Sequence, residues 1–94
     1  MIYIVVISSL ARDRLRNLPP ELTSFVLDHL DNKLARDPVR LSERASFAYP
    51  SGQAYYCDRV LGDQHWDFVI YFRYSQDEEH LLIADIDSIA QREV

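Results

Sequence analysis

Leu-Arg-Asn-Leu-Pro-Pro-Glu, residues 15–21, is the stretch that decides how this chain folds. Pro19 ends a helix there, because proline lacks a backbone N–H and restricts the residue before it. Pro20 suits the first position of a new helix, and Glu21 lies near the positive end of that helix's dipole. The stretch therefore predicts two helices with a very short connection, which favours an antiparallel pair.

The residues on either side of this junction support both helices. Ser8 or Ser9 can cap the first helix, and the second, residues 20–36, ends before Asp37-Pro38. Apolar side chains recur at helical spacing in each helix, so both predict an apolar stripe facing a shared layer. The stripes consist of Ala11, Leu15 and Leu18 in the first helix and of Leu22, Phe25, Val26, Leu30 and Leu34 in the second.

The shared layer is predicted to be a sheet. Residues 2–7 are apolar without alternation, which is typical of a strand covered on both faces. Residues 54–61 and 66–74 predict two further strands around a turn at 62–65. The second of these strands alternates between a face with Trp66, Phe68, Ile70, Phe72 and Tyr74 and a face with Asp67, Val69, Tyr71 and Arg73.

The C-terminal part predicts one more strand. A polar loop at 75–79 leads to residues 80–87, in which one face is expected to hold Leu82, Ala84 and Ile86. Between residues 40 and 53 the pattern is weak, so this part is either a loop or an irregular edge strand around Phe47–Tyr49.

Length and element order together predict an α+β fold. At 94 residues the chain is too short for two domains that each bury a useful core, so we expect one domain over residues 1–94. The two N-terminal helices are expected to pack on a twisted, mainly antiparallel sheet of about four strands, in the order strand, helix, helix and three strands.

Composition narrows the functional classes. The apolar start gives way to Ser8 and Arg12 well short of a membrane span, so we expect a cytoplasmic protein with no membrane segment. Cys57 is the single cysteine, which excludes an intramolecular disulfide and fits a reducing compartment. We expect no cofactor.

Charge is uneven along the chain. Residues 1–44 hold seven basic and six acidic side chains, whereas residues 45–94 hold three basic and nine acidic ones. A protein that binds nucleic acid normally presents a basic face, because release of counterions supplies much of the affinity. The C-terminal half is therefore poorly suited to binding phosphate.

The helix junction, the Ala-x-x-x-Leu-x-x-Leu-Pro pattern of residues 11–19 and the helix end at Asp37-Pro38 resemble the RelE/ParE superfamily of toxins from bacterial toxin-antitoxin modules. The resemblance covers nearly the whole chain. Asp67-Phe68-Val69-Ile70-Tyr71 is similar to a family strand written Tyr-Arg-Val-Ile-Tyr, with three of five positions matching. The resemblance implies the α+β fold, an antitoxin partner and, in ribonuclease members, ribosome-dependent cleavage of mRNA by basic side chains and often a tyrosine.

Several positions depart from the ribonuclease pattern. Phe68 stands where the family strand has arginine, and Asp85 and Asp87 lie where basic groups are usual and would repel phosphate. The end of the chain, residues 91–94, resembles a family tail His-Arg-x-x-Val-Tyr without its histidine and final tyrosine. We therefore expect a RelE/ParE-like toxin component, or a descendant of one, that acts by protein binding with weak or absent ribonuclease activity.

Two other functions stay open. An active ribosome-dependent endoribonuclease would need relocated catalytic groups, for which the candidates are Arg73, Arg92 and Arg59, together with Tyr71 or His80. A ParE-like inhibitor of DNA gyrase would need no catalytic residues. Partners in these cases would be the ribosome with its mRNA, or gyrase, and a homo-oligomer is a further alternative. Candidates for binding RNA or a protein partner are Arg40, Arg44 and Arg59.

Three residues near the 62–65 turn have the spacing of metal ligands. Asp63, His65 and Asp67 alternate, and their oxygen and nitrogen atoms could bind a divalent cation. A solvated hairpin turn explains the same residues, and no second His/Glu cluster accompanies them. We therefore expect no metal site.

Overall fold

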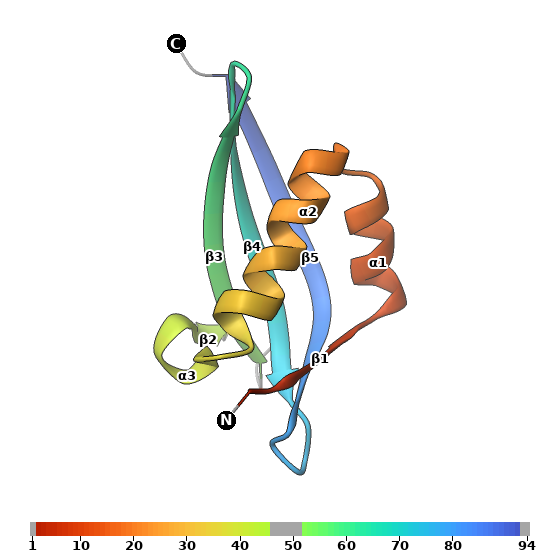
Figure 1. Cartoon of the computed structure of the whole chain (residues 1–94), viewed down its shortest axis with the longest axis vertical. Coiled ribbons are helices and arrows are strands. Elements are labelled where there is room, and N and C mark those ends of the chain that lie inside the picture. The colour runs from red at the N-terminus through yellow and green to blue at the C-terminus, as the bar shows by residue number, and fades with distance from the viewer. Residues whose placement is uncertain (1, 46–51, 93–94) are drawn as a thin grey trace.

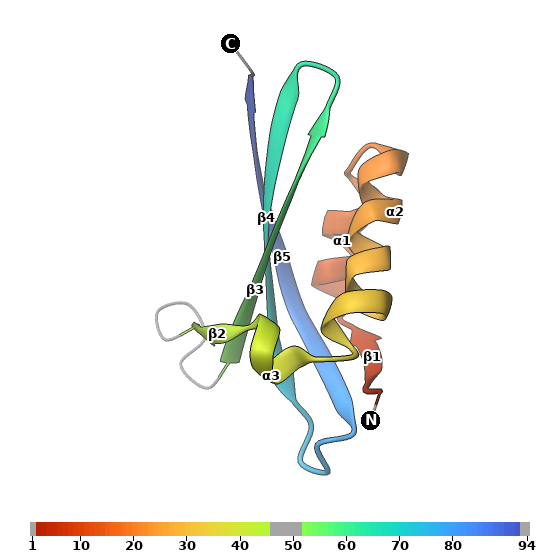
Figure 2. The ribbon, with the colours of Figure 1, turned by 60° about the vertical axis from the view of Figure 1, so that its left-hand side comes forward.

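The computed structural model describes residues 2–45 and 52–92 of the chain. Helices α1 and α2 lie on one side of a twisted sheet, and the long strands β3, β4 and β5 extend beyond them (Figures 1 and 2). The elements are β1 (Ile4–Ile7), α1 (Ser9–Arg16), α2 (Pro20–His29), the π-helical turn η1 (Leu30–Leu34), α3 (Pro38–Leu41), β2 (Glu43–Ala45), β3 (Gly52–Leu61), β4 (Gln64–Tyr74) and β5 (His80–Arg92).

The sheet has five strands in the order β1-β5-β4-β3-β2. β1 pairs parallel with β5, and the other three pairs are antiparallel. The predicted α+β class and mainly antiparallel sheet are confirmed, whereas the predicted number of four strands is wrong by one. The additional strand is β2, whose three residues carry no alternating pattern; the edge strand considered around Phe47–Tyr49 falls outside the described residues.

The helix junction has the predicted form. Ser8 caps α1, since its Oγ accepts from the Ala11 N–H at 3.1 Å and donates to the Ala84 carbonyl at 2.8 Å. Pro20 is the first residue of α2, and the Thr23 hydroxyl donates to the Leu15 carbonyl at 2.7 Å. These hydrogen bonds fix α1 against both β5 and α2.

The core lies between the two helices and one face of the sheet. The alternation predicted for β4 is confirmed, because Phe68, Ile70 and Phe72 are at most 1% exposed and Trp66 and Tyr74 pack against them. The other buried members of this cluster are Ala11, Leu15, Leu22, Val26, Leu30, Leu34, Tyr55, Leu81, Ile83 and Ile86. Among the described residues, no helix is long and apolar enough to cross a bilayer.

The predicted burial of β1 and the predicted end of β5 both need correction. β1 is not covered on both faces, because its alternate residues Ile4 and Val6 are 58% and 44% exposed. β5 does not end at residue 87 but continues to Arg92, where it pairs with the first residues of β4. Its second half is exposed and mostly polar, with Ile89 and Ala90 too few to form an apolar pattern, so the hydrophobic pattern alone could not reveal it.

A β-bulge breaks the alternation that was predicted within β5. Tyr71 pairs with Asp85 and Phe72 pairs with Ile83, so Ala84 is an extra residue between the two pairs. Leu82 and Ala84 are consequently half-buried, while Ile86 is in the core. The prediction that these three share one face is wrong because the bulge shifts the register.

Candidate functional site

The side of the sheet that faces away from α1 and α2 is called the open face here (Figure 2). Residues that pair across strands point to the same side, so the register assigns each strand residue to a face. Exposed apolar side chains on the open face are Ile4, Val6, Tyr56, Val60 and Ile89. Ile4 and Val6 lie at one end of this face and Val60 and Ile89 about 20 Å away near the β3-β4 turn, so a partner covering both would have to extend along the strands.

The charged residues on the open face are mostly acidic. The register places on it the exposed carboxylates of Glu43, Asp58, Asp67 and Asp87, and also Asp85, which pairs with Tyr71 and is mostly buried. Among strand residues in the described ranges, Arg73 is the one arginine on this face, and the pairing positions of the other arginines assign them to the opposite side. This face would repel a phosphate backbone over most of its area.

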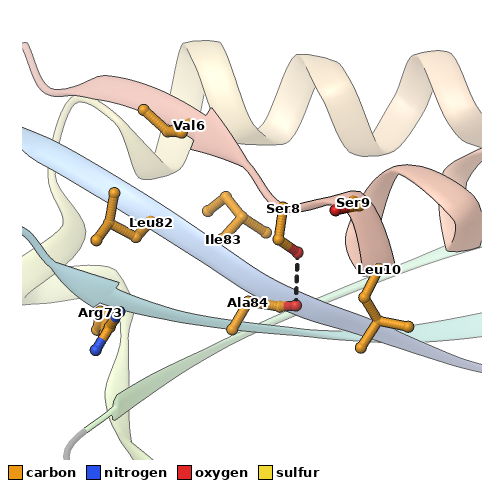
Figure 3. Close-up of a pocket in the computed structure, with 8 residues that line it drawn as sticks. All are labelled: Val6, Ser8, Ser9, Leu10, Arg73, Leu82, Ile83 and Ala84. Carbon is orange, nitrogen blue, oxygen red and sulfur yellow. Dashed lines mark hydrogen bonds between the residues drawn. The ribbon is translucent and has the colours of Figure 1, made fainter.

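Arg73 borders a shallow pocket of about 390 Å³ at the junction of β1, β5 and α1 (Figure 3). The hydrogen bond from Ser8 to the Ala84 carbonyl crosses this pocket and joins the end of β1 to β5. The lining is Val6, Ser8, Ser9, Leu10, Arg73, Leu82, Ile83 and Ala84. An apolar pocket with one guanidinium at its border suits an apolar side chain next to a carboxylate.

The structure separates the residues considered as catalytic candidates. Tyr71 and Arg73 are neighbours on the open face of β4, but Arg92 pairs with Gln64 at the far end of the same strand. Nine residues of strand separate Gln64 from Arg73, a distance of about 30 Å. Arg92 Nε instead lies 3.4 Å from Asp63 Oδ2, so it closes the end of the β3-β4 hairpin.

The binding candidates are also dispersed. The Arg59 guanidinium lies 5.3 Å from the centre of the Phe25 ring, on the side of the sheet that carries the helices. Arg40 Nε lies 2.6 Å from Asp37 Oδ2 at the start of α3, and this bond holds the pKa of the Asp37 carboxyl below its usual value. Arg44 lies in β2 and pairs with Gln53 of β3. Gln53 is six residues from Arg59 along β3, so Arg44 is about 20 Å from Arg59.

Position 68 cannot present a side chain to a ligand on the open face. Phe68 is 1% exposed and packs between the Phe25 ring and the Trp66 ring, with centroid distances of 6.0 and 6.2 Å. It therefore belongs to the helix-covered core. An arginine at this position would be buried in apolar surroundings rather than aimed at RNA.

Asp85 has a structural role that the sequence did not reveal. The residue is 8% exposed, and its carboxylate accepts from the Ile86 N–H at 2.8 Å and lies 3.3 Å from Arg14 Nε. The partners Arg14 and Asp85 are 71 residues apart in sequence, so only the packing of α1 on β5 brings them together. Asp87, by contrast, is exposed on the open face.

A buried polar pair connects α2 to the sheet. The Tyr55 hydroxyl lies 2.6 Å from His29 Nδ1. Burial, followed by the neighbouring Cys57, raises the pKa of Tyr55 to about 12, so its hydroxyl keeps its proton and donates. Burial, followed by Lys33, lowers the pKa of His29, which favours the neutral imidazole that can accept this proton.

Cys57 is not arranged as a nucleophile. Burial, followed by Asp58, raises the pKa of its thiol to about 12. The reactive thiolate is therefore scarce at neutral pH, and Cys57 packs against the core as a small apolar residue.

The metal-ligand grouping that the sequence suggested has a different membership in the structure. His65 and Asp67 do lie together, but Asp63 is turned toward Arg92. Its place is taken by Asp58, whose Oδ2 lies 2.8 Å from His65 Nε2. A hairpin turn of two residues, Gly62 and Asp63, causes this exchange because it sets Asp58 opposite Asp67.

Comparison with solved structures identifies the fold. The chain superposes on a chain of the toxin-antitoxin complex RelBE2 from Mycobacterium tuberculosis with a TM-score of 0.74, covering 93% of this chain and 98% of that chain. The chain has a RelE/ParE-type fold. The two sequences are 20% identical, no protein-family model matches this sequence, and no curated protein matches it either. The RelE/ParE-type fold predicted from the helix junction is thus confirmed through three-dimensional structure rather than through sequence similarity.

Proposed function

We propose that this chain is a toxin-type component of a bacterial toxin-antitoxin module that acts by binding a protein on its open face, without ribonuclease activity. The fold supports the first part of this proposal, because a protein of known structure with this fold belongs to a toxin-antitoxin complex. The observation that carries the second part is the composition of the open face, where exposed apolar side chains are interspersed with four exposed carboxylates and one arginine.

Ribonuclease chemistry needs a group that binds phosphate, a group that stabilises developing charge, and an acid or base close to both. On the open face, Arg73 and Tyr71 are neighbours, and Asp85 pairs with Tyr71. His80 is on the same face, two residues along β5 from Leu82, which pairs with Arg73. Arg92 is about 30 Å away along the strand. Among the described strand residues, Arg73 is therefore the one arginine on the open face that could bind phosphate, and no second arginine lies there to stabilise developing charge.

The residues of the open face also indicate what kind of partner would bind it. A helix or an extended segment laid along it would bury the exposed apolar residues, of which Val6, Val60 and Ile89 are examples. Basic residues in that segment would pair with Asp67 and Asp87, and one carboxylate could reach Arg73 at the pocket. We therefore expect an amphipathic partner segment that is more basic than acidic.

Two measurements on the full chain test this proposal. The chain is expressed by induction, and mRNA integrity is followed by primer extension while growth is recorded. The purified chain is also mixed with the small protein encoded beside its gene, and the complex is measured by calorimetry. The proposal expects intact mRNA and a stoichiometric complex. Cleavage of ribosome-bound mRNA, or absence of a complex, would overturn it.

A further inference from the structure

Three potential metal ligands converge on the open face near the β3-β4 hairpin. Asp58, His65 and Asp67 each offer one ligand atom, and these atoms all lie within 4.8 Å of one another. His65 Nε2 is 2.8 Å from Asp58 Oδ2 and 3.9 Å from Asp67 Oδ1. The side chains are accessible from solvent, with exposures of 62% for Asp58, 37% for His65 and 56% for Asp67.

The sheet holds these groups together through its register. Asp58 pairs directly with Asp67, and His65 lies two residues before Asp67 on the same face. Strand residues that pair directly have Cβ atoms about 5 Å apart, and the diagonal neighbours are within reach of a longer side chain. The arrangement is therefore set by the backbone rather than by flexible loops.

The charges at this position favour a bound cation. Two carboxylates directly opposite each other in an antiparallel pair repel, which destabilises the pair unless a positive charge lies between them. Asp87 adds a third negative charge as a diagonal neighbour of Asp67 on the next strand. The adjacent basic residue Arg59 does not neutralise them, because its guanidinium lies over Phe25 on the other side of the sheet.

The spacing of the atoms fits a tetrahedral ion. Two ligand atoms that each lie about 2.1 Å from a tetrahedral zinc ion are about 3.4 Å from one another. The two distances from His65 Nε2, 2.8 and 3.9 Å, bracket that value, so shifts of about half an ångström would bring both pairs of atoms to it. The ligand oxygens of Asp58 and Asp67 lie within 4.8 Å of each other. A shallow depression of about 150 Å³ beside Asp58 and Asp67 leaves room for a fourth, solvent ligand.

We propose that Asp58, His65 and Asp67 form a surface site for a divalent transition metal ion such as Zn²⁺. One imidazole with two carboxylates is a mixed nitrogen and oxygen donor set, which prefers zinc over magnesium because magnesium favours oxygen ligands and retains its water. The site lies on the open face beside Val60 and Ile89. It shares Asp67 with the surface proposed above for the partner, and titration of the chain alone tests it separately from partner binding.

The experiment titrates ZnCl2, and separately MgCl2, into the untagged full chain by calorimetry at neutral pH. His65→Ala removes the nitrogen ligand. His80→Ala is the matched control, because His80 is similarly exposed and lies 3.5 Å from a single carboxylate, that of Asp77. Asp58→Asn serves as a second ligand variant, and circular dichroism verifies that each variant is folded.

The proposal expects one equivalent of Zn²⁺ to bind the wild type and the His80→Ala variant with equal affinity. Loss of either ligand, in His65→Ala or Asp58→Asn, is expected to weaken binding by at least about tenfold. Binding of Mg²⁺ is expected to be weaker than binding of Zn²⁺ in every variant. Equal zinc affinity in the wild type and His65→Ala, or no zinc binding by the wild type, would show that His65 forms only an ion pair and would overturn the proposal.

Discussion

Arg14 Nε lies 3.3 Å from Asp85 Oδ1, and this ion pair ties α1 to the bulged segment of β5. Asp85 is at the position where the family resemblance implied a basic group, yet its carboxylate is mostly buried and also binds the Ile86 N–H. The pair therefore holds the edge of the open face in place. At this position a basic side chain could bind phosphate, whereas Asp85 makes a structural contact instead.

Asp85→Ala should lower the free energy of unfolding by about 1–2 kcal/mol, because it leaves the Ile86 N–H without its acceptor while half-exposed Arg14 regains water. Urea denaturation measures the change. Asp13→Ala is the control, since Asp13 forms an exposed ion pair with Arg16 at 3.2 Å whose loss should cost no more than about 0.5 kcal/mol. Equal losses in the two variants would contradict this role for Asp85.

Phe68→Arg restores the residue type of the family strand but should not restore ribonuclease activity. The side chain is in the core, so the substitution buries a charge and should destabilise the fold by more than about 4 kcal/mol. Val69→Arg places the same charge on the open face and should be tolerated. Thermal denaturation and primer extension measure both effects. A stable Phe68→Arg variant that cleaves mRNA would show that position 68 faces the substrate.

The His29-Tyr55 contact should make stability depend on pH. The folded-state pKa of His29 is below the ordinary value of 6.5, so the unfolded chain binds the proton more readily. Stability from this residue is therefore complete above pH 6.5 and declines as the pH falls through that value toward the folded-state pKa. Urea denaturation at pH 7.5 and 5.5 should show a smaller decrease for His29→Gln than for the wild type. An identical decrease would exclude this contribution.

Local sequence signals were sufficient to predict the elements in which apolar residues recur at regular spacing. The prolines at 19 and 20 mark the helix junction, and the alternation in β4 identifies a strand that places Phe68, Ile70 and Phe72 in the core. β2 and the second half of β5 were not predicted, because their residues are mostly exposed and do not show an alternating apolar pattern. Their pairing with β3 and β4 is decided by neighbours distant in sequence.

The length of the β3-β4 turn determines which residues lie beside His65. A four-residue turn at 62–65, as predicted, would have set Asp58 opposite Val69. The observed two-residue turn, in which Gly62 has a φ of +63° that favours glycine, sets Asp58 opposite Asp67. Recognising Gly62-Asp63 as a two-residue hairpin turn was the available signal for grouping Asp58 with His65.

The affinity of the open face for the protein encoded beside the gene decides whether this face binds the partner. Ile89→Asp changes an exposed residue of this face, and Val39→Asp makes the same change on α3, outside the sheet. Calorimetry should show that Ile89→Asp weakens binding by about 30-fold, or about 2 kcal/mol, because it adds charge and removes apolar contact. Val39→Asp should bind as the wild type does. Equal affinities for all three proteins would contradict binding through the open face.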